Sequence, residues 1–202
     1  LSLLFWGANS IAQSNINSPY SSYGLGEIGA LDHSVSSALG NTTISIQDST
    51  MLNFYNPATY SALGKGQPLF SFGVSSKLST FSEGKSSNFS SVIGIQNFSL
   101  GMSFSRHFGL AFGLKPYSRR GYEISSRVLI EEDSLVYIYS GEGGINEVFL
   151  GLSSNIFKYG GTTVSVGANF GFLFGNTSNT RKSGLIDPGN SQYAGGVSIK
   201  SI

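Results

Sequence analysis

The sequence predicts an all-β fold: an antiparallel transmembrane β-barrel, present in part with about seven strands, that follows an N-terminal plug or hatch segment. Three observations predict it. From Pro68 onward, apolar residues alternate with small or polar ones. Only 11% of the 202 residues are charged, whereas 27 are glycine and 15 are phenylalanine. No apolar run approaches the ~20 residues of a membrane helix. Few charges and dispersed apolar residues are typical of a wall that meets lipid on one face and water on the other.

The two ends of the sequence predict a fragment. Residues 1–12 are apolar and end with small residues at Ser10 and Ala12, which is the spacing of a signal-peptidase site. We therefore expect a signal-peptide remnant there, with a buried N-terminal strand or helix as the alternative. At the other end, alternation is still running at Ile202, and a closed barrel cannot stop with an unpaired edge in lipid.

Residues 13–66 are predicted to form the hatch or plug, and residues 67–202 the first part of the barrel. The first segment is rich in Ser, Asn and Gly, and it alternates poorly. Such irregular chain cannot lie in lipid, but a wide barrel can hold it where water or inward side chains satisfy its backbone.

Period-two alternation predicts the strands in order. The expected strands are 70–80, 98–104, 110–114, 122–130, 134–139, 148–156 and 164–174. Polar stretches at 82–88 and 176–191 are interpreted as loops, and the acids Glu131, Glu132 and Asp133 as a solvated outer hairpin. A short turn is expected at 106–109, and Gly160 and Gly161 favour a tight hairpin.

The hairpin from Glu147 to Gly175 is the clearest of these elements. Every second residue of its latter half is apolar, while Ser165, Gly167 and Asn169 alternate with them. A strand places the apolar set on one face, and 11 residues is a length that crosses a bilayer when tilted. The residues predicted to face lipid are Val164, Val166, Phe170, Phe172 and Phe174.

No pattern indicates catalytic residues, a cofactor site or a metal site, so we do not expect an enzyme. The glycines at 24, 26 and 29 match a dinucleotide-binding spacing, but no buried strand precedes them. The histidines, His33 and His107, have no ligand spacing, and there is no cysteine. Glu131 and Glu132 are better explained by a solvated loop than by a glycosidase pair. A net charge of +1 gives no reason to expect nucleic acid.

One stretch resembles a known family. The sequence from Ser37 to Leu63 contains a glycine, an Asp-Ser-Thr step and an Asn-Pro-Ala motif ahead of the first long strand. This resembles the FadL-type outer-membrane transport family, and the segments 20–26, 109–117 and 143–151 resemble one branch of it. The hatch residues carried over are Gly40, Asp48, Ser49, Thr50, Asn56, Pro57 and Ala58. Because Asn56 and Pro57 also favour a turn, a structural corner is an equal explanation for that motif.

The resemblance implies a plugged barrel in the outer membrane of a Gram-negative bacterium. Its expected function is the uptake of hydrophobic compounds such as long-chain fatty acids, with membrane lipid and a hydrophobic small molecule as partners. The alternative is a barrel that serves a protein secretion system as subunit or cargo shuttle, with a protein partner in the outer membrane. A structural barrel with neither role is the third possibility.

Overall fold

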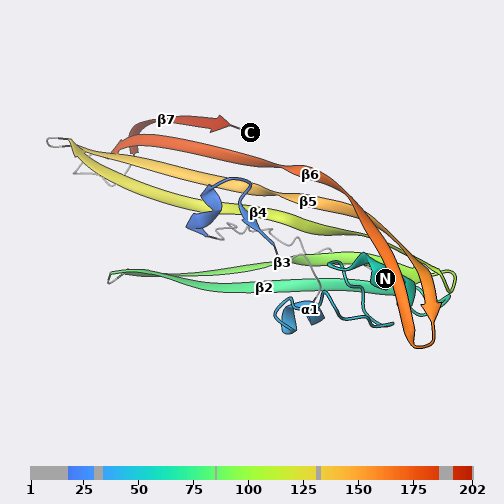
Figure 1. Cartoon of the computed structure of the whole chain (residues 1–202). Helices are drawn as coiled ribbons and strands as arrows, with labels where there is room; N and C mark the ends of the chain where they lie inside the picture. Colours follow the sequence, from blue (N-terminus) through green and yellow to red (C-terminus); the bar gives the residue numbers. More distant parts are fainter. Residues whose placement is uncertain (1–17, 30–33, 85, 131–132, 187–192, 202) are drawn as a thin grey trace, which may run out of the picture.

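The computed structural model describes residues 18–29, 34–84, 86–130, 133–186 and 193–201. These residues form one open sheet of seven strands, in which all neighbouring strands are antiparallel (Figure 1). The strands are β1 (Glu27–Ile28), β2 (Leu69–Glu83), β3 (Ser86–Ser103), β4 (Phe108–Ile130), β5 (Asp133–Tyr159), β6 (Thr162–Ile186) and β7 (Tyr193–Ser201). Their order is β2-β3-β4-β5-β6-β7, and β1 pairs with β4. The predicted all-β, antiparallel fold is confirmed, and closure into a barrel stays a prediction.

Several strands are longer than the alternation predicted. The expected strands 110–114 and 122–130 are both parts of β4, and the expected strands 134–139 and 148–156 are both parts of β5. The register between β4 and β5 shifts between Pro116 and Ser118, where a bulge exchanges the two faces. The predicted loop at 176–191 is also wrong as far as Ile186, because β6 continues to that residue. Pairing between strands does not require an apolar face, so β4, β5 and β6 continue where the alternation fades.

The hairpin connections are partly as predicted. Tyr159 pairs with Thr162, so Gly160 and Gly161 form a two-residue turn, and Gly160 has a φ of 58°. The turn expected at 106–109 lies slightly earlier, because β4 already begins at Phe108. The acids Glu131 and Glu132 lie outside the described residues.

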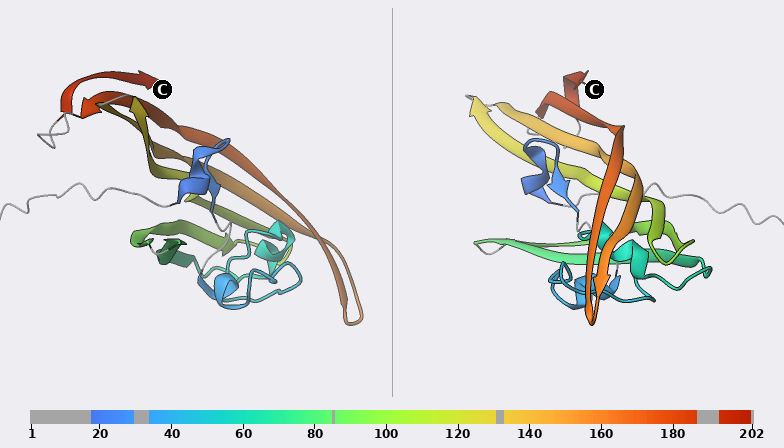
Figure 2. Two further views of the ribbon diagram at one scale, coloured as in Figure 1. Left: turned by 90° about the vertical axis from the view of Figure 1, so that its left-hand side faces the viewer. Right: turned by 45° about the vertical axis from the view of Figure 1, so that its right-hand side comes forward.

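The chain ahead of β2 folds mainly into short pieces on the concave side of the sheet (Figure 2). Its elements are the 3₁₀ helices η1 (Pro19–Ser22) and η2 (Pro57–Ala62), the strand β1 and the helix α1 (Ser34–Ala38). A small apolar core joins this N-terminal segment to the sheet: Leu52, Phe54, Tyr60 and Leu63 pack with Ala111 of β4 and Phe149 of β5. The predicted signal-peptide remnant, residues 1–12, lies outside the described residues.

Strands β3 and β4 separate over most of their length. Their pairing runs only from Phe98 opposite Leu114 to Ser103 opposite Gly109. Beyond that point β3 stays with β2 and β4 stays with β5, so the wall divides, as Figure 1 shows between the β2–β3 hairpin and β4. On the side of β4 that faces this split, β1 pairs at Arg119 and Ser118.

Candidate functional site

The docking surface between the N-terminal segment and the inner wall is the most elaborate site in the described part of the chain. The wall contributes small residues that allow close approach. A Cβ placed on Gly109 would lie 2.5 Å from the amide nitrogen of Ser61, and one on Gly167 would lie 2.7 Å from the carbonyl oxygen of Pro57. Only glycine fits at these two positions while η2 lies where it does.

Tyr60 is the anchor of this contact. Its side chain is fully buried, and its hydroxyl donates a hydrogen bond to Oδ1 of Asn169 on β6 at 3.2 Å. Asn169 donates in turn to the carbonyl of Phe54 at 3.2 Å. Ser61 donates to Oδ1 of Asn155 on β5 at 2.7 Å. Polar groups of both partners are thus satisfied across the contact, as burial requires.

The predicted Asn-Pro-Ala motif forms the start of η2. Asn56 is the N-cap, because its Oδ1 accepts from the amide of Ala58 at 3.2 Å, and Pro57 occupies the first turn. The Nδ2 of Asn56 donates to the carbonyl of Ile44 at 2.9 Å. The motif therefore builds a capped corner that presents Tyr60 and Ser61 to the wall.

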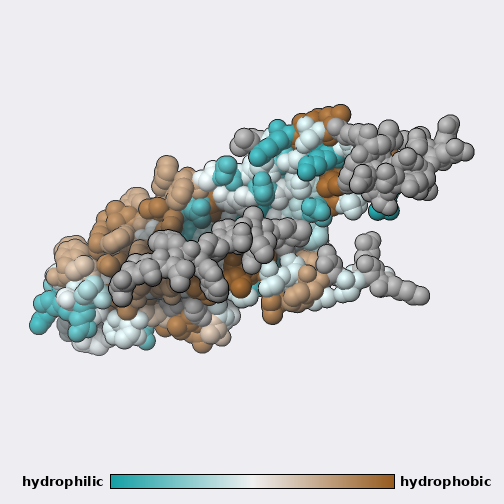
Figure 3. Space-filling view, turned by 180° about the vertical axis from the view of Figure 1, so that it is seen from behind, coloured by the Kyte–Doolittle hydropathy of each residue, from teal (hydrophilic) through white to brown (hydrophobic). Residues whose placement is uncertain are grey.

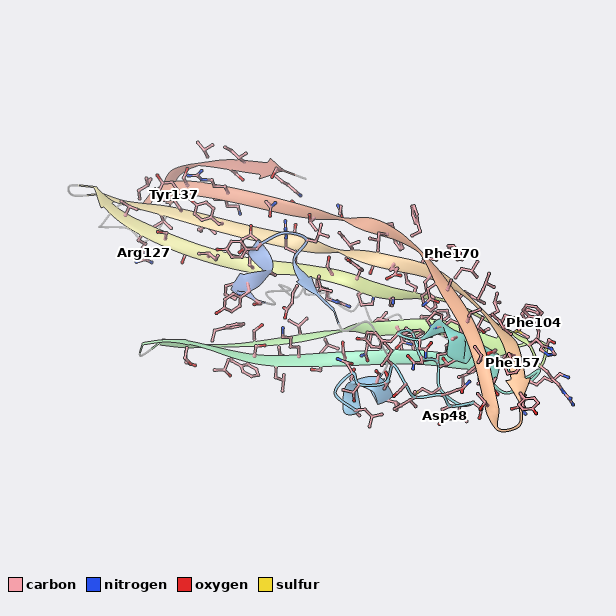
Figure 4. All side chains as sticks on the ribbon, viewed as in Figure 1. Asp48, Phe104, Arg127, Tyr137, Phe157 and Phe170 are labelled. Carbon is pink, nitrogen blue, oxygen red and sulfur yellow. The ribbon has the colours of Figure 1, made fainter. Side chains whose placement is uncertain are left out.

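The other predicted hatch residues lie on the surface of the segment. Oδ1 of Asp48 accepts from the amide and the hydroxyl of Thr50, both at 2.8 Å. These two bonds, the amide first, lower the pKa of the Asp48 carboxyl below 3.8. Ser49 accepts from the amide of Gly64 at 3.3 Å. Gly40 has a φ of 66° and an open space where a side chain would point. Asp48 is seen at the edge of the molecule in Figure 4.

Asn53 holds the same loop together, although the sequence does not predict this role. It is buried, and its Nδ2 donates to the carbonyls of Thr43 and Ile46. Its Oδ1 accepts from the amides of Tyr55 and Asn56 at 3.1 Å each. A lone asparagine in a Ser- and Asn-rich segment carries no signal that separates it from its neighbours.

A largely buried ion pair lies between β4 and β5, beside Phe54 of the segment. Nζ of Lys115 on β4 is 3.6 Å from Oε2 of Glu147 on β5. The same ammonium lies 5.5 Å from the ring centroid of Phe54 and 5.4 Å from that of Phe149. One aromatic partner comes from the segment and one from the wall, so Lys115 binds the two together.

A second contact joins η1 and β1 to β4. The amide of Ser18 donates to the carbonyl of Gly121 at 3.0 Å, and the amide of Gly121 donates to Oγ of Ser21 at 3.1 Å. Arg120 is buried, and it donates to the carbonyl of Gly24 and to Oδ1 of Asn179.

The residues predicted to face lipid lie on the opposite, convex face. Gly167 and Asn169 contact the N-terminal segment. Successive residues of a strand point to opposite faces, so the even-numbered residues that alternate with these two point away from the segment. Phe170 visibly points outward in Figure 4. The exposed fractions are 47% for Val164, 49% for Val166, 64% for Phe170, 70% for Phe172 and 42% for Phe174. Contact with lipid itself stays a prediction.

These residues belong to a wider apolar band. Exposed apolar side chains on the same face come from neighbouring strands, including Phe70 and Phe72 of β2 and Phe112 of β4. Figure 3 shows brown side chains gathered toward one end of the molecule and more hydrophilic ones toward the other. Eleven residues at about 3.3 Å each, tilted by about 40°, span roughly 28 Å, which is close to the roughly 25 Å height of the apolar band of a transmembrane barrel.

Within the described residues, no group of His, Cys, Asp and Glu side chains has the arrangement of a metal site. The helices of that part are too short or too polar to cross a membrane. The arrangement described above is one of contact between segments, and it positions no nucleophile beside a base.

Comparison with known proteins gives one match. Residues 1–193 match the family described as BamG. No curated protein and no solved structure matches the chain. The match corrects the sequence interpretation: the FadL-type assignment is wrong, because the matching family is a different one. The expected uptake of hydrophobic compounds and the alternative role in secretion both followed from the FadL-type resemblance, so both are withdrawn.

Proposed function

This chain belongs to the BamG family, and from that membership we propose that it is a component of the β-barrel assembly machinery in the outer membrane of a Gram-negative bacterium. The family match is the observation that carries the proposal, since Bam denotes this machinery. The proposed partner is a protein of the same machinery, and the proposed role requires no covalent chemistry.

The two faces of the wall support this role. The convex face carries an apolar band of bilayer height, which suits residence in the outer membrane. The concave face is occupied by the chain's own N-terminal segment through Tyr60, Asn169 and Lys115. We propose that this segment plugs the barrel, so that the protein works through its surfaces.

Purification of the full-length protein from outer membranes tests the proposal. A tagged copy, extracted in mild detergent, is expected to carry other components of the assembly machinery at a fixed ratio. A tagged outer-membrane barrel of another family, expressed to the same level, is the control and is expected to carry none.

Depletion of the protein is the second arm. Folded outer-membrane barrels, measured by heat-modifiable migration, are expected to decrease after depletion, while inner-membrane proteins stay constant. Absence of co-purified machinery together with unchanged barrel levels contradicts the proposal.

A further inference from the structure

The division of the wall between β3 and β4 leaves one strand edge with unusual chemistry. In the described part of the chain, residues 91–95 of β3 have a strand only on their β2 side. The sequence from Ser86 to Ser105 contains no charged residue and no proline. Natural proteins protect exposed edges with lysine, proline or inward charges, and none of these residues occurs here.

The direction of the backbone groups follows from two hydrogen bonds. The carbonyl of Gly94 faces β2, where Oγ of Ser75 donates to it at 3.4 Å. The carbonyl of Ile95 faces the split, where Nη2 of Arg119 donates to it at 2.8 Å. Because successive residues of a strand alternate, the N–H and C=O groups of Ile93 and Ser91 also point into the split.

Among the described residues, a few side-chain contacts bridge the split, one of them a hydrogen bond from Nε2 of Gln96 to Oγ of Ser37 at 3.1 Å. Besides the Arg119 bond, Lys77 of β2 pairs with Glu27 of β1, and these side chains are 48% and 37% exposed. Ion pairs with that exposure contribute little. Behind them is a cavity of about 340 Å³, lined among others by Glu27, Lys77, Val92 and Arg119. Opening the split therefore needs the movement of a few side chains.

We propose that this split is a docking site for an extended strand of another outer-membrane β-barrel polypeptide, which adds antiparallel to the edge of β3 at Ser91, Ile93 and Ile95. The inference rests on the proposed function, and it names the partner class of that function. Backbone pairing supplies the recognition, as in other cases of strand addition.

The side chains of β3 select the pattern of the guest strand. Phe89, Ile93 and Ile95 are exposed on the convex face by 65%, 64% and 56%, whereas Val92 and Gly94 border the cavity. A guest strand with alternating apolar and small polar residues extends the apolar convex face and the small, polar concave face of the sheet. This alternation is the pattern of barrel strands. Within the split, β1 pairs with β4 at Ser118 and Arg119 and not with β3, so β1 leaves the edge of β3 to the guest strand.

The experiment uses the full-length protein in detergent and a biotinylated ten-residue peptide of alternating valine and threonine with one central cysteine. The chain has no cysteine of its own. Ser91→Cys places a thiol on the edge of β3. Leu150→Cys is the control: it places a thiol on the same face of β5, a strand that is paired on both sides, with Phe112 opposite Leu150 on β4 and Phe170 opposite it on β6. The peptide cysteine is supplied as its mixed disulfide with thionitrobenzoate, so the protein thiolate attacks the peptide sulfur and releases thionitrobenzoate. We expect this exchange on the order of tenfold faster at Ser91→Cys.

A backbone variant tests the mechanism. In the Ser91→Cys chain, Ile93→Pro removes an N–H that points into the split and leaves the ladder to β2 intact. We expect it to reduce peptide capture on the order of tenfold, while Ile93→Ala keeps it within about twofold. Equal capture at Ser91→Cys and Leu150→Cys indicates general adhesion or occupation by lipid, and it overturns the inference. Equal capture by the proline and alanine variants overturns it as well.

The outcomes separate this inference from the proposed function. Capture at Ser91→Cys without any effect of depletion on barrel levels contradicts the assembly role and keeps the edge site. Reduced barrel levels after depletion, with no preferential capture, keep the assembly role and reject the edge site. The cysteine comparison needs no proline, so it stands even where Ile93→Pro fails to migrate as a folded barrel.

Discussion

An alanine at Gly109 tests whether close backbone contact holds the N-terminal segment against the wall. The added Cβ would collide with the carbonyl group of Tyr60 and would lie 2.5 Å from the amide nitrogen of Ser61, whereas ordinary contact begins at 3.4 Å, so the segment must recede by more than about 0.9 Å. That displacement also takes the Tyr60 hydroxyl out of its 3.2 Å hydrogen bond to Asn169. Overpacking costs about 1–3 kcal/mol and the lost hydrogen bond about 1 kcal/mol.

The docked state is therefore weakened by roughly 2–4 kcal/mol, or roughly 30- to 1000-fold in its equilibrium with the undocked state. Chymotrypsin reports this equilibrium, because its cleavage sites at Phe54 and Tyr60 are buried while the segment is docked. The Gly109→Ala variant is expected to be cleaved faster than the unchanged protein, by a factor that approaches this 30- to 1000-fold shift in the docking equilibrium. Gly161→Ala is the matched control, since a Cβ at Gly161 meets open space. If Gly109→Ala is cleaved at the control rate and still migrates as a folded barrel, the reasoning is refuted.

Three further predictions concern other parts of the chain. Phe172→Arg is expected to lower the stability of the barrel in a bilayer by about 2–4 kcal/mol, measured by urea unfolding; a loss equal to that of Phe172→Leu contradicts a lipid-facing position. Lys115→Met leaves Glu147 buried without its cation and is expected to cost about 3–5 kcal/mol, with partial recovery on adding Glu147→Gln; no recovery contradicts the ion pair. The hydrogen bonds from Thr50 lower the pKa of Asp48, so its contribution to the turn is present above the ordinary aspartate pKa and is lost as the pH falls through the lowered pKa; a carboxyl ¹³C titration with its midpoint at or above the ordinary value contradicts this.

The sheet was predictable where apolar and small residues alternate. Val164 to Phe174 alternate except at Leu173, so the strand and its two faces follow from the sequence. Past Gly175 the alternation is lost, and β6 continues through polar residues that resemble a loop in composition. The bulge at Pro116 has the same effect in β4, because one extra residue exchanges the faces and breaks the period.

The contacts of the N-terminal segment could be predicted less well. Asn56 and Pro57 carry a local signal, and the structure places them in a capped corner. Tyr60, Asn169 and Lys115 carry none, because their roles depend on residues as many as 115 positions away. The sequence interpretation places Gly167 on the water-facing side of the wall and Gly109 in a turn, whereas both lie against the backbone of η2. The sequence shows that a residue is small, but it does not show which part of the chain packs against that residue.

Collision of nitroxide spin labels with oxygen and with a water-soluble nickel complex tests the central claim most directly. The chain has no cysteine, so single cysteines at positions 162–175 of the full-length protein in bilayers carry one label each. Labels at even positions such as 166, 170 and 172 are expected to meet oxygen, and those at 167 and 169 to be shielded by the N-terminal segment. Preferential collision of the even positions with the nickel complex would show that the convex face meets water, and it would contradict the account.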